Sequence, residues 1–345
     1  MRRIYIRNAE QISLQQPLSE AWMTAPTLTE ASWATSVDPD FREWLSAAES
    51  RRLGKILKRA LVTALTALRK AEIEQPDAIC VGTGLGCMVN TERLLETLCS
   101  EGETMFSPTH FMQSTHNTIA SLLAIHTRSH GYNVTYSHKD LSFDLALFDA
   151  WMQLGQGRIH TALVGGYDEL TPSYDTLLRR IGYLGVAGQG PGAEAAMTML
   201  LSTESRNALC ELAGLRILYR PDEDELRRAV ETLLATSGIA AEELDGVVTG
   251  VNGHAANDRI YEWLTNTLLP GIPTLRYKHL FGTSYTAPAY APYVAAHSLA
   301  RGFIPETLVY GGIPLHDTAP RTLLLVNQRD GKQYSLQLLR ALCGD

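Results

Sequence analysis

The chain has 345 residues, 45% of them hydrophobic and 19% charged, which is enough to bury a large core in one α/β unit or in two domains. Its formal net charge of −7 argues against a nucleic-acid-binding surface, which needs clustered lysines and arginines. No run of about 18 apolar residues occurs, so a transmembrane helix is not expected.

The first residues resemble the start of a strand and lack the apolar stretch of a signal peptide. The five cysteines show neither CxxC pairs nor the spacing of a disulfide-rich secreted domain, so most are expected to be small core residues. They are Cys80, Cys87, Cys99, Cys210 and Cys343. We therefore expect a cytoplasmic protein with no metal and no cofactor.

In the first half of the chain, short apolar runs alternate with helical patterns. Apolar residues recur every three or four positions over 55–70, which predicts an amphipathic helix, and the alternating run over 132–136 predicts a strand. The expected elements are a helix over 55–70, a strand over 78–82, helices over about 87–98 and 114–127, a strand over 132–136, a helix over 141–156, and strands over 161–166 and 195–201.

A similar series begins near residue 210. The acidic run over 222–224 marks the first turn of a helix, where the helix dipole favours negative charge. The expected elements are strands over 215–219, 246–250 and 274–277, a helix after 224, a helix that holds Trp263 and Leu264, a helix over about 289–301, and strands near 308, over 323–326 and over 334–338. This alternation predicts an α/β fold with mostly parallel sheets. We expect one compact body with two related halves, 1–205 and 206–345, and no linker between them.

Several stretches resemble the β-ketoacyl synthases of the thiolase superfamily. The stretch over 156–166 resembles the long helix and the strand that closes on two glycines, and 192–196 resembles the family's Gly-Glu-Gly-Ala-Ala segment. In the second half, 257–262 resembles the segment after the first catalytic histidine, and 278–283 resembles the Lys-x-x-x-Gly-His motif. The resemblance implies a thiolase-like fold, in which two pseudo-duplicated halves form a layered α-β-α-β-α body.

In this alignment Asp140, Gly250 and Thr283 stand where an active synthase has a cysteine and two histidines. Condensation needs a thiolate to hold the acyl chain, and imidazoles to assist decarboxylation and stabilise the enolate. An aspartate cannot form a useful thioester, and at a helix start it is a natural N-cap. The resemblance therefore implies a synthase-shaped protein with no catalytic residues of its own.

A narrower resemblance is carried by 82–87 (GTGLGC), 111–118 (FMQSTHNT) and 130–133 (HGYN), which are similar to the small chain length factors of bacterial aryl polyene and flexirubin pathways. Those proteins are the non-catalytic halves of ketosynthase heterodimers that elongate a polyene on an acyl carrier protein. The implied partner is therefore a catalytic β-ketoacyl synthase subunit, whose acyl tunnel this chain would close. The residues expected at the tunnel or dimer seam are Phe111, Met112, Ser114 and His116, and the interface strand carries Tyr132, Val134 and Tyr136.

Two other functions stay open on the sequence. The chain could be an active acyltransferase or condensing enzyme with an unorthodox nucleophile, Ser114 or Cys87, or a homodimeric scaffold that binds acyl carrier protein. Ser114 and His116 do not share a helix face, so a buried hydrogen-bonded cluster near the dimer seam is the expected role of 114–117. The basic run over 51–59 is either a solvated helix face or a docking patch for the carrier protein or the partner subunit.

Overall fold

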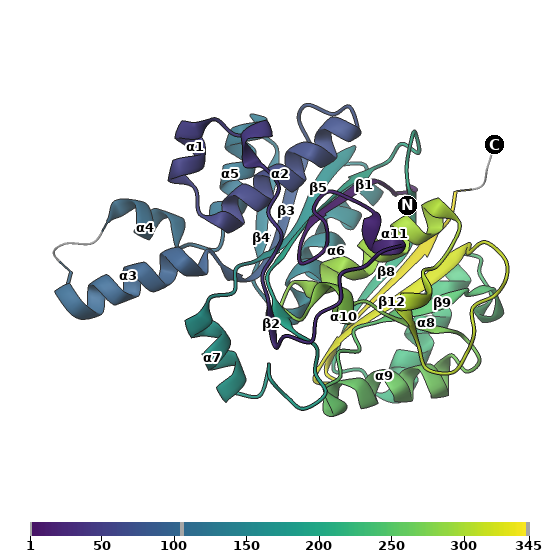
Figure 1. The fold of residues 1–345 in the computed structure, drawn as a ribbon. Coiled ribbons are helices and arrows are strands. Elements are labelled where there is room, and N and C mark those ends of the chain that lie inside the picture. Colours follow the sequence, from purple (N-terminus) through teal and green to yellow (C-terminus); the bar gives the residue numbers. More distant parts are fainter. Residues whose placement is uncertain (1, 104–106, 343–345) are drawn as a thin grey trace.

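The computed structural model describes residues 2–103 and 107–342, so Cys343 lies outside the described residues. Within these ranges, eleven strands form one sheet in the order β11-β10-β9-β12-β13-β8-β1-β7-β5-β3-β4 (Figure 1). A separate short ribbon pairs β2 (Trp33–Ala34) with β6 (Gly192–Ala193).

The large sheet is built from two halves with the same strand order. In the first half the strands are β1 (Tyr5–Ile12), β3 (Ala78–Gly86), β4 (Tyr132–Tyr136), β5 (Thr161–Asp168) and β7 (Ala195–Ser202), arranged as β4-β3-β5-β7-β1. In the second they are β8 (Cys210–Tyr219), β9 (Gly246–Thr249), β10 (Thr274–Arg276), β12 (Thr322–Arg329) and β13 (Gln333–Arg340), arranged as β10-β9-β12-β13-β8, with β11 (Val309–Tyr310) outside β10. The halves join where β1 pairs with β8.

The expectation of mostly parallel strands is wrong. β3 runs parallel to β4 and β5, and β9 runs parallel to β10 and β12. In contrast, β1, β7, β8 and β13 run antiparallel to their neighbours in the sheet. The connections explain the difference, because a parallel pair needs a long crossover, whereas β12 turns directly into β13 through Asp330, Gly331 and Lys332.

Helices cover and separate the two halves of the sheet (Figure 1). On the outer face of the first half lie α2 (Lys55–Lys70) and α5 (Thr118–Thr127), between the halves lie α6 (Ser142–Gly155) and α11 (Tyr290–Arg301), and on the outer face of the second half lie α8 (Glu223–Thr236) and α9 (Ala255–Leu268). Other helices are α1 (Ala47–Arg52), α3 (Met88–Glu101), α4 (Pro108–Gln113), α7 (Pro172–Arg180) and α10 (Lys278–Phe281). The layered thiolase-like fold that the resemblance implied is therefore confirmed.

The strands between these layers are apolar on both faces, as β3 illustrates. Ala78 and Cys80 pack into the central core with α6 and α11, while Ile79 and Val81 pack against α2 and α5. A strand covered on both sides has no polar face, so it appears in sequence as a continuous apolar run. This is why the short runs without alternation were recognisable as strands.

The helix expected over 114–127 begins four residues later. α4 ends at Gln113, and α5 starts at Thr118. Ser114 Oγ donates to the Phe111 carbonyl at 2.8 Å, and Thr118 Oγ1 donates to the Met112 carbonyl at 3.1 Å. Short polar side chains that bond nearby carbonyls compete with helical hydrogen bonds, so this segment turns between two helices.

Three of the cysteines in the described part of the chain, Cys80, Cys87 and Cys210, are buried as expected, whereas Cys99 is exposed. None of the described helices combines the length and apolar character that a membrane span requires. Within residues 2–103 and 107–342, no three histidine, cysteine or acidic side chains cluster as metal ligands would.

Candidate functional site

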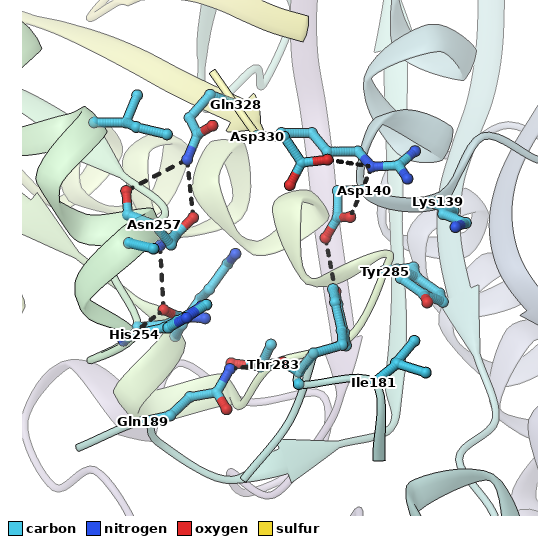
Figure 2. Close-up of a pocket in the computed structure, with 17 residues that line it drawn as sticks. Lys139, Asp140, Ile181, Gln189, His254, Asn257, Thr283, Tyr285, Gln328 and Asp330 are labelled. Atoms are coloured by element: carbon cyan, nitrogen blue, oxygen red, sulfur yellow. Dashed lines mark hydrogen bonds and ion pairs between the residues drawn. The ribbon is translucent and has the colours of Figure 1, made fainter. Parts of the chain in front are cut away.

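A cavity of about 500 Å³ opens where several strands end (Figure 2). Its walls come from the segments that follow β4, β9 and β10, from the end of β12, and from the loop after α7. The edge where parallel strands end is the usual ligand-binding edge of an α/β sheet. The polar side chains that matter most below are Asp140, Tyr183, Lys278, Thr283 and Arg329.

Asp140 reaches the cavity from the segment after β4. Tyr183 Oη donates to Asp140 Oδ1 at 2.7 Å, and Arg329 Nε lies 3.8 Å from Oδ2. The side chain of Asp140 is 13% exposed, and burial raises the pKa of its carboxyl above the ordinary value. A carboxylate in this position makes polar contacts across the cavity and cannot hold an acyl chain as a thioester.

The expectation that Asp140 caps a helix is wrong. α6 begins at Ser142, and its N-cap position is Leu141, so Asp140 lies one residue too early. The local polar contacts are made by Ser142, whose Oγ accepts from the His138 N–H at 2.8 Å and donates to the Lys139 carbonyl at 2.7 Å. A short 3-10 turn over Lys139–Leu141 rotates the aspartate away from the helix axis and toward Tyr183.

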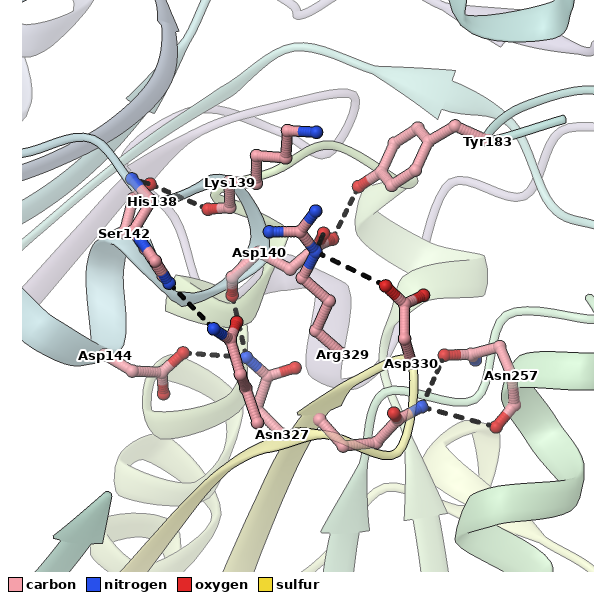
Figure 3. A network of polar contacts seen from close by, with 12 residues as sticks. His138, Lys139, Asp140, Ser142, Asp144, Tyr183, Asn257, Asn327, Arg329 and Asp330 are labelled. Atoms are coloured by element: carbon pink, nitrogen blue, oxygen red, sulfur yellow. Dashed lines mark hydrogen bonds and ion pairs between the residues drawn. The ribbon is translucent and has the colours of Figure 1, made fainter. Parts of the chain in front are cut away.

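A buried polar network joins the segment around Asp140 and the start of α6 to the second half of the sheet (Figure 3). Asp144 of α6 is fully buried and accepts from Asn327 Nδ2 at 2.7 Å and from Gln337 Nε2 at 2.8 Å. Asn327 Nδ2 also donates to the Asp140 carbonyl at 2.8 Å. Burial raises the pKa of Asp144 to about 6, against the hydrogen bonds that favour its charged form. The network holds the start of α6 against β12 and β13.

Gly250 lies directly after β9 and behind the cavity wall. A Cβ atom at this position would lie 2.5 Å from Tyr261 Oη and 3.3 Å from Lys278 Nζ. Tyr261 is 1% exposed, and its Oη accepts from the Gln328 N–H at 3.1 Å, so it cannot move aside freely. The position therefore has no space for a histidine in the present packing.

Lys278 is the first residue of α10, Thr283 follows the end of that helix, and both line the same cavity. Thr283 is 2% exposed, and its Oγ1 has no hydrogen-bond partner among the described residues. Its backbone is held by a bond from its own N–H to the Pro191 carbonyl at 2.8 Å and by one from the Ala193 N–H to its carbonyl at 3.1 Å. The bend is possible because Gly282 adopts a φ of 80°.

The structure thus brings Asp140 and Thr283 into one cavity and places Gly250 against Lys278, which lines that cavity. Asp140 supplies a carboxylate and Thr283 a hydroxyl, while Gly250 has no side chain. Condensation would need a thiolate and two imidazoles. His254 also lines the cavity, at the N-cap of α9. The equivalence of these three positions to a cysteine and two histidines stays a prediction.

The segment expected at the tunnel or seam lies on the surface of the single chain. Phe111 and Met112 are 56% and 70% exposed on α4, His116 is exposed, and Ser114 is half-buried. Thr115, His116 and Asn117 all face solvent in the single chain, so the expectation of a buried cluster near the dimer seam stays a prediction about the assembled dimer. None of these residues lines the cavity at Asp140.

Neither candidate for an unorthodox nucleophile is activated. Cys87 is fully buried, and burial raises the pKa of its thiol to about 12, so the thiolate is scarce near neutral pH. The Ser114 hydroxyl donates to a backbone carbonyl of its own turn. Among the described residues, this hydroxyl makes no hydrogen bond to a general base that would activate it.

The expected interface strand, β4, lies at one end of the sheet, and in the described residues it pairs only with β3. Tyr132 is 40% exposed, and Val134 and Tyr136 are half-buried. Asn133 Nδ2 donates to the Ala120 carbonyl at 2.9 Å, which ties β4 to α5. An edge strand with apolar side chains is a ready template for pairing with another chain.

The sequence did not indicate Tyr183, Arg329, Asp144 or Asn327 as part of the site. Each is an ordinary polar residue in a loop, helix or strand, and none belongs to a recognisable motif. Tyr183 meets Asp140 across 43 positions of the chain, and Asn327 meets it across 187. Only the packing of the two halves brings them together.

With the geometry established, comparison with known proteins identifies the relatives of this fold. The family model "Beta-ketoacyl synthase, N-terminal domain" matches residues 20–236. No curated protein matches the sequence.

Three solved structures illustrate the likeness. The ishigamide ketosynthase/chain length factor superposes with a TM-score of 0.82 at 18% identity, covering 99% of this chain and 100% of that chain. A β-ketoacyl synthase from Burkholderia phymatum STM815 gives 0.79 at 15% identity, with 99% and 100% covered. The ketosynthase ApeO in complex with its chain length factor ApeC, from Xenorhabdus doucetiae, gives 0.76 at 16% identity, with 99% and 98% covered. These likenesses show a shared fold.

Proposed function

This chain belongs to the β-ketoacyl synthase family, and on that premise we propose that it is a non-catalytic chain length factor. In this role it pairs with an active β-ketoacyl synthase in the cytoplasm and shapes that partner's acyl tunnel during aryl polyene biosynthesis on an acyl carrier protein. The observation that supports the proposal is the cavity at Asp140, which Asp140 and Thr283 line with a carboxylate and a hydroxyl, at positions that we predict to correspond to a catalytic cysteine and histidine.

The chemistry of condensation supports this role. The growing chain must be held as a thioester, and the buried Asp140 carboxylate cannot hold it that way. Each missing acid–base group typically removes about 10²–10⁴ in rate, and loss of the nucleophile removes the covalent route altogether. A family member without these groups can contribute to synthesis by its surface and shape.

Two surface features support pairing with a second subunit. No strand in the described part of the chain pairs with the outer edge of β4, and the exposed Phe111 and Met112 lie on α4, which leads into the helix that packs against β4. Obligate interfaces commonly bury more than about 2,000 Å² and are apolar. An open strand edge flanked by exposed apolar side chains fits such an interface.

Co-expression with a candidate synthase tests the pairing. We expect the two chains to co-purify as a stable heterodimer and this chain to be poorly soluble when it is made alone. Size-exclusion chromatography with mass measurement distinguishes the outcomes. A well-behaved homodimer that ignores the synthase would favour the scaffold function, and a well-behaved monomer would contradict an obligate seam.

Met112 provides the sharpest test of length control. If it forms the floor of the partner's tunnel, Met112→Ala should lengthen the products, because one methylene beyond a packed floor costs about 1–3 kcal/mol. That cost biases product length roughly tenfold. The measurement is mass spectrometry of the chains released by the heterodimer. Leu177→Ala is the control, since Leu177 is 49% exposed on α7, away from this segment. Equal product lengths in all three proteins would exclude Met112 as the floor.

A further inference from the structure

The cavity at Asp140 contains an amine that no contact in the structure uses. Lys278 is 5% exposed and lines the cavity. Within residues 2–103 and 107–342, no carboxylate oxygen lies within 4.0 Å of its Nζ, and no hydrogen bond joins it. Burying an ammonium group costs free energy unless the group is paired. An unpaired lysine at a cavity wall therefore leaves an amine available to a ligand in the cavity.

The surroundings leave the Lys278 amine open to the cavity. Gly250 has no side chain, and a Cβ there would lie 3.3 Å from Nζ. Burial lowers the pKa of Lys278, against the opposing fields of Asp140, Asp258 and Asp144. A lower pKa leaves more of the amine neutral near pH 7, and the neutral amine is the nucleophilic form.

A second group without a partner belongs to a residue in the wall of the same cavity. Thr283 is 2% exposed, and its Oγ1 is without a hydrogen-bond partner among the described residues. A hydroxyl in this state can donate to an oxyanion that forms beside Lys278. The cavity volume of about 500 Å³ is enough for a short acyl group and part of its carrier thiol.

We propose that Lys278 is an acylation site for short acyl thioesters, with Thr283 as the donor to the carbonyl oxygen. The choice of thioesters as the electrophile rests on the proposed function, because acyl thioesters are the substrates that such a complex handles. The Lys278 nitrogen attacks the thioester carbonyl carbon, an N–C bond forms and the C–S bond breaks. The thiolate leaves and takes up the proton that the nitrogen loses, so the products are an amide and a free thiol.

This reaction differs from condensation in its outcome. An amide on lysine does not pass its acyl group onward, so each chain accepts one acyl group and there is no turnover. The modification removes the positive charge of Lys278 and fills part of the cavity. It is therefore compatible with a subunit that carries out no condensation.

Peptide mapping by mass spectrometry tests the proposal. The full chain, in complex with its partner, is incubated with the N-acetylcysteamine thioester of acetate near pH 7, and acetylation is followed at each lysine. We expect Lys278 to be labelled at least about tenfold faster than the exposed Lys332, and its labelling to level off at a lower pH. Labelling of Lys278 no faster than that of Lys332 would overturn the proposal.

Variants separate the site from the fold. Lys278→Met should remove the fast label and Lys332→Met should leave it, while Thr283→Val should slow it about tenfold by removing the oxyanion donor. A fast label that survives in Lys278→Met, or one unaffected in Thr283→Val, would contradict the corresponding assignment. Thermal melts confirm that each variant is folded. Co-purification and product length are measured separately, so failure of acylation is distinguishable from failure of the proposed function.

Discussion

Replacing Gly250 with alanine is expected to lower the free energy of unfolding by about 3 kcal/mol, because the added methyl group enters filled space. Its Cβ would lie 2.5 Å from Tyr261 Oη, closer than real Cβ contacts come, and 3.1 Å from Tyr261 Cζ, which is tighter than most. Tyr261 is buried and accepts the Gln328 N–H, so moving it costs packing and a hydrogen bond. Urea denaturation of Gly250→Ala measures the loss.

Two variants separate this collision from a general effect of removing glycine. Gly190→Ala is the matched control, since a Cβ there meets nothing closer than 3.9 Å. The double variant Gly250→Ala/Tyr261→Phe lacks the hydroxyl that the new methyl group would meet. Its loss in free energy of unfolding should therefore be smaller than the sum of the losses in the two single variants. If Gly250→Ala were as stable as Gly190→Ala, the packing around Tyr261 would be looser than the structure indicates.

The same collision bears on restoring activity. A histidine at 250 would displace Tyr261 and cover Lys278, so the triple change Asp140→Cys, Gly250→His and Thr283→His should not create a condensing enzyme. Tyr261 and Lys278 fill the space that a side chain at 250 would need.

Replacing Arg59 with leucine is expected to cost about 3–5 kcal/mol of stability, the range for breaking a buried ion pair from one side. Arg59 of α2 is 1% exposed; its Nη1 lies 2.7 Å from Glu194 Oε2, and its Nε lies 2.5 Å from Asp38 Oδ1. The pair fixes α2 to the segment before β7 and to the loop after β2. Removing the guanidinium leaves the buried Glu194 carboxylate without its charge partner.

Charge-matched variants show whether the orphaned carboxylate is the cause. Arg59→Leu/Glu194→Leu should lose less than the sum of the single variants, because no unpaired buried charge remains at Glu194. Arg206→Leu is the surface control, since its pair with Glu72 is exposed on both sides and should contribute no more than about 1 kcal/mol. If thermal or urea unfolding showed equal losses of stability for Arg59→Leu and Arg206→Leu, burial would not increase the contribution of the Arg59 ion pair.

Local pattern was sufficient for the elements but not for their directions. The 55–70 periodicity became α2, and the apolar run that begins at 78 became β3, which continues to Gly86. Whether two strands run parallel depends on what connects them and where the chain returns. For this reason the antiparallel β1, β7, β8 and β13 were not predicted.

For the candidate site, the motif around 278–283 indicated where Lys278 and Thr283 belong, and the structure places both in one cavity with Asp140. The contacts that these side chains make could not be predicted from the sequence. Asp140 looked like a helix cap because its neighbours in sequence suggested nothing else, and its actual contacts come from Tyr183 and Arg329. The cavity could be located from the motifs, whereas its hydrogen bonds could not.

The amino-acid sequence alone determined the layered α/β class, the family, and which residue types stand at 140, 250 and 283, because short-range periodicity and motif spacing are local properties of the chain. Only the tertiary structure decided that Tyr261 fills the space at Gly250, that Asp140 bonds Tyr183, and that the Lys278 amine has no charge partner among the residues that the structure describes. These are contacts between distant segments, and they depend on how two halves of a sheet and a central helix layer close on each other to bury their apolar faces.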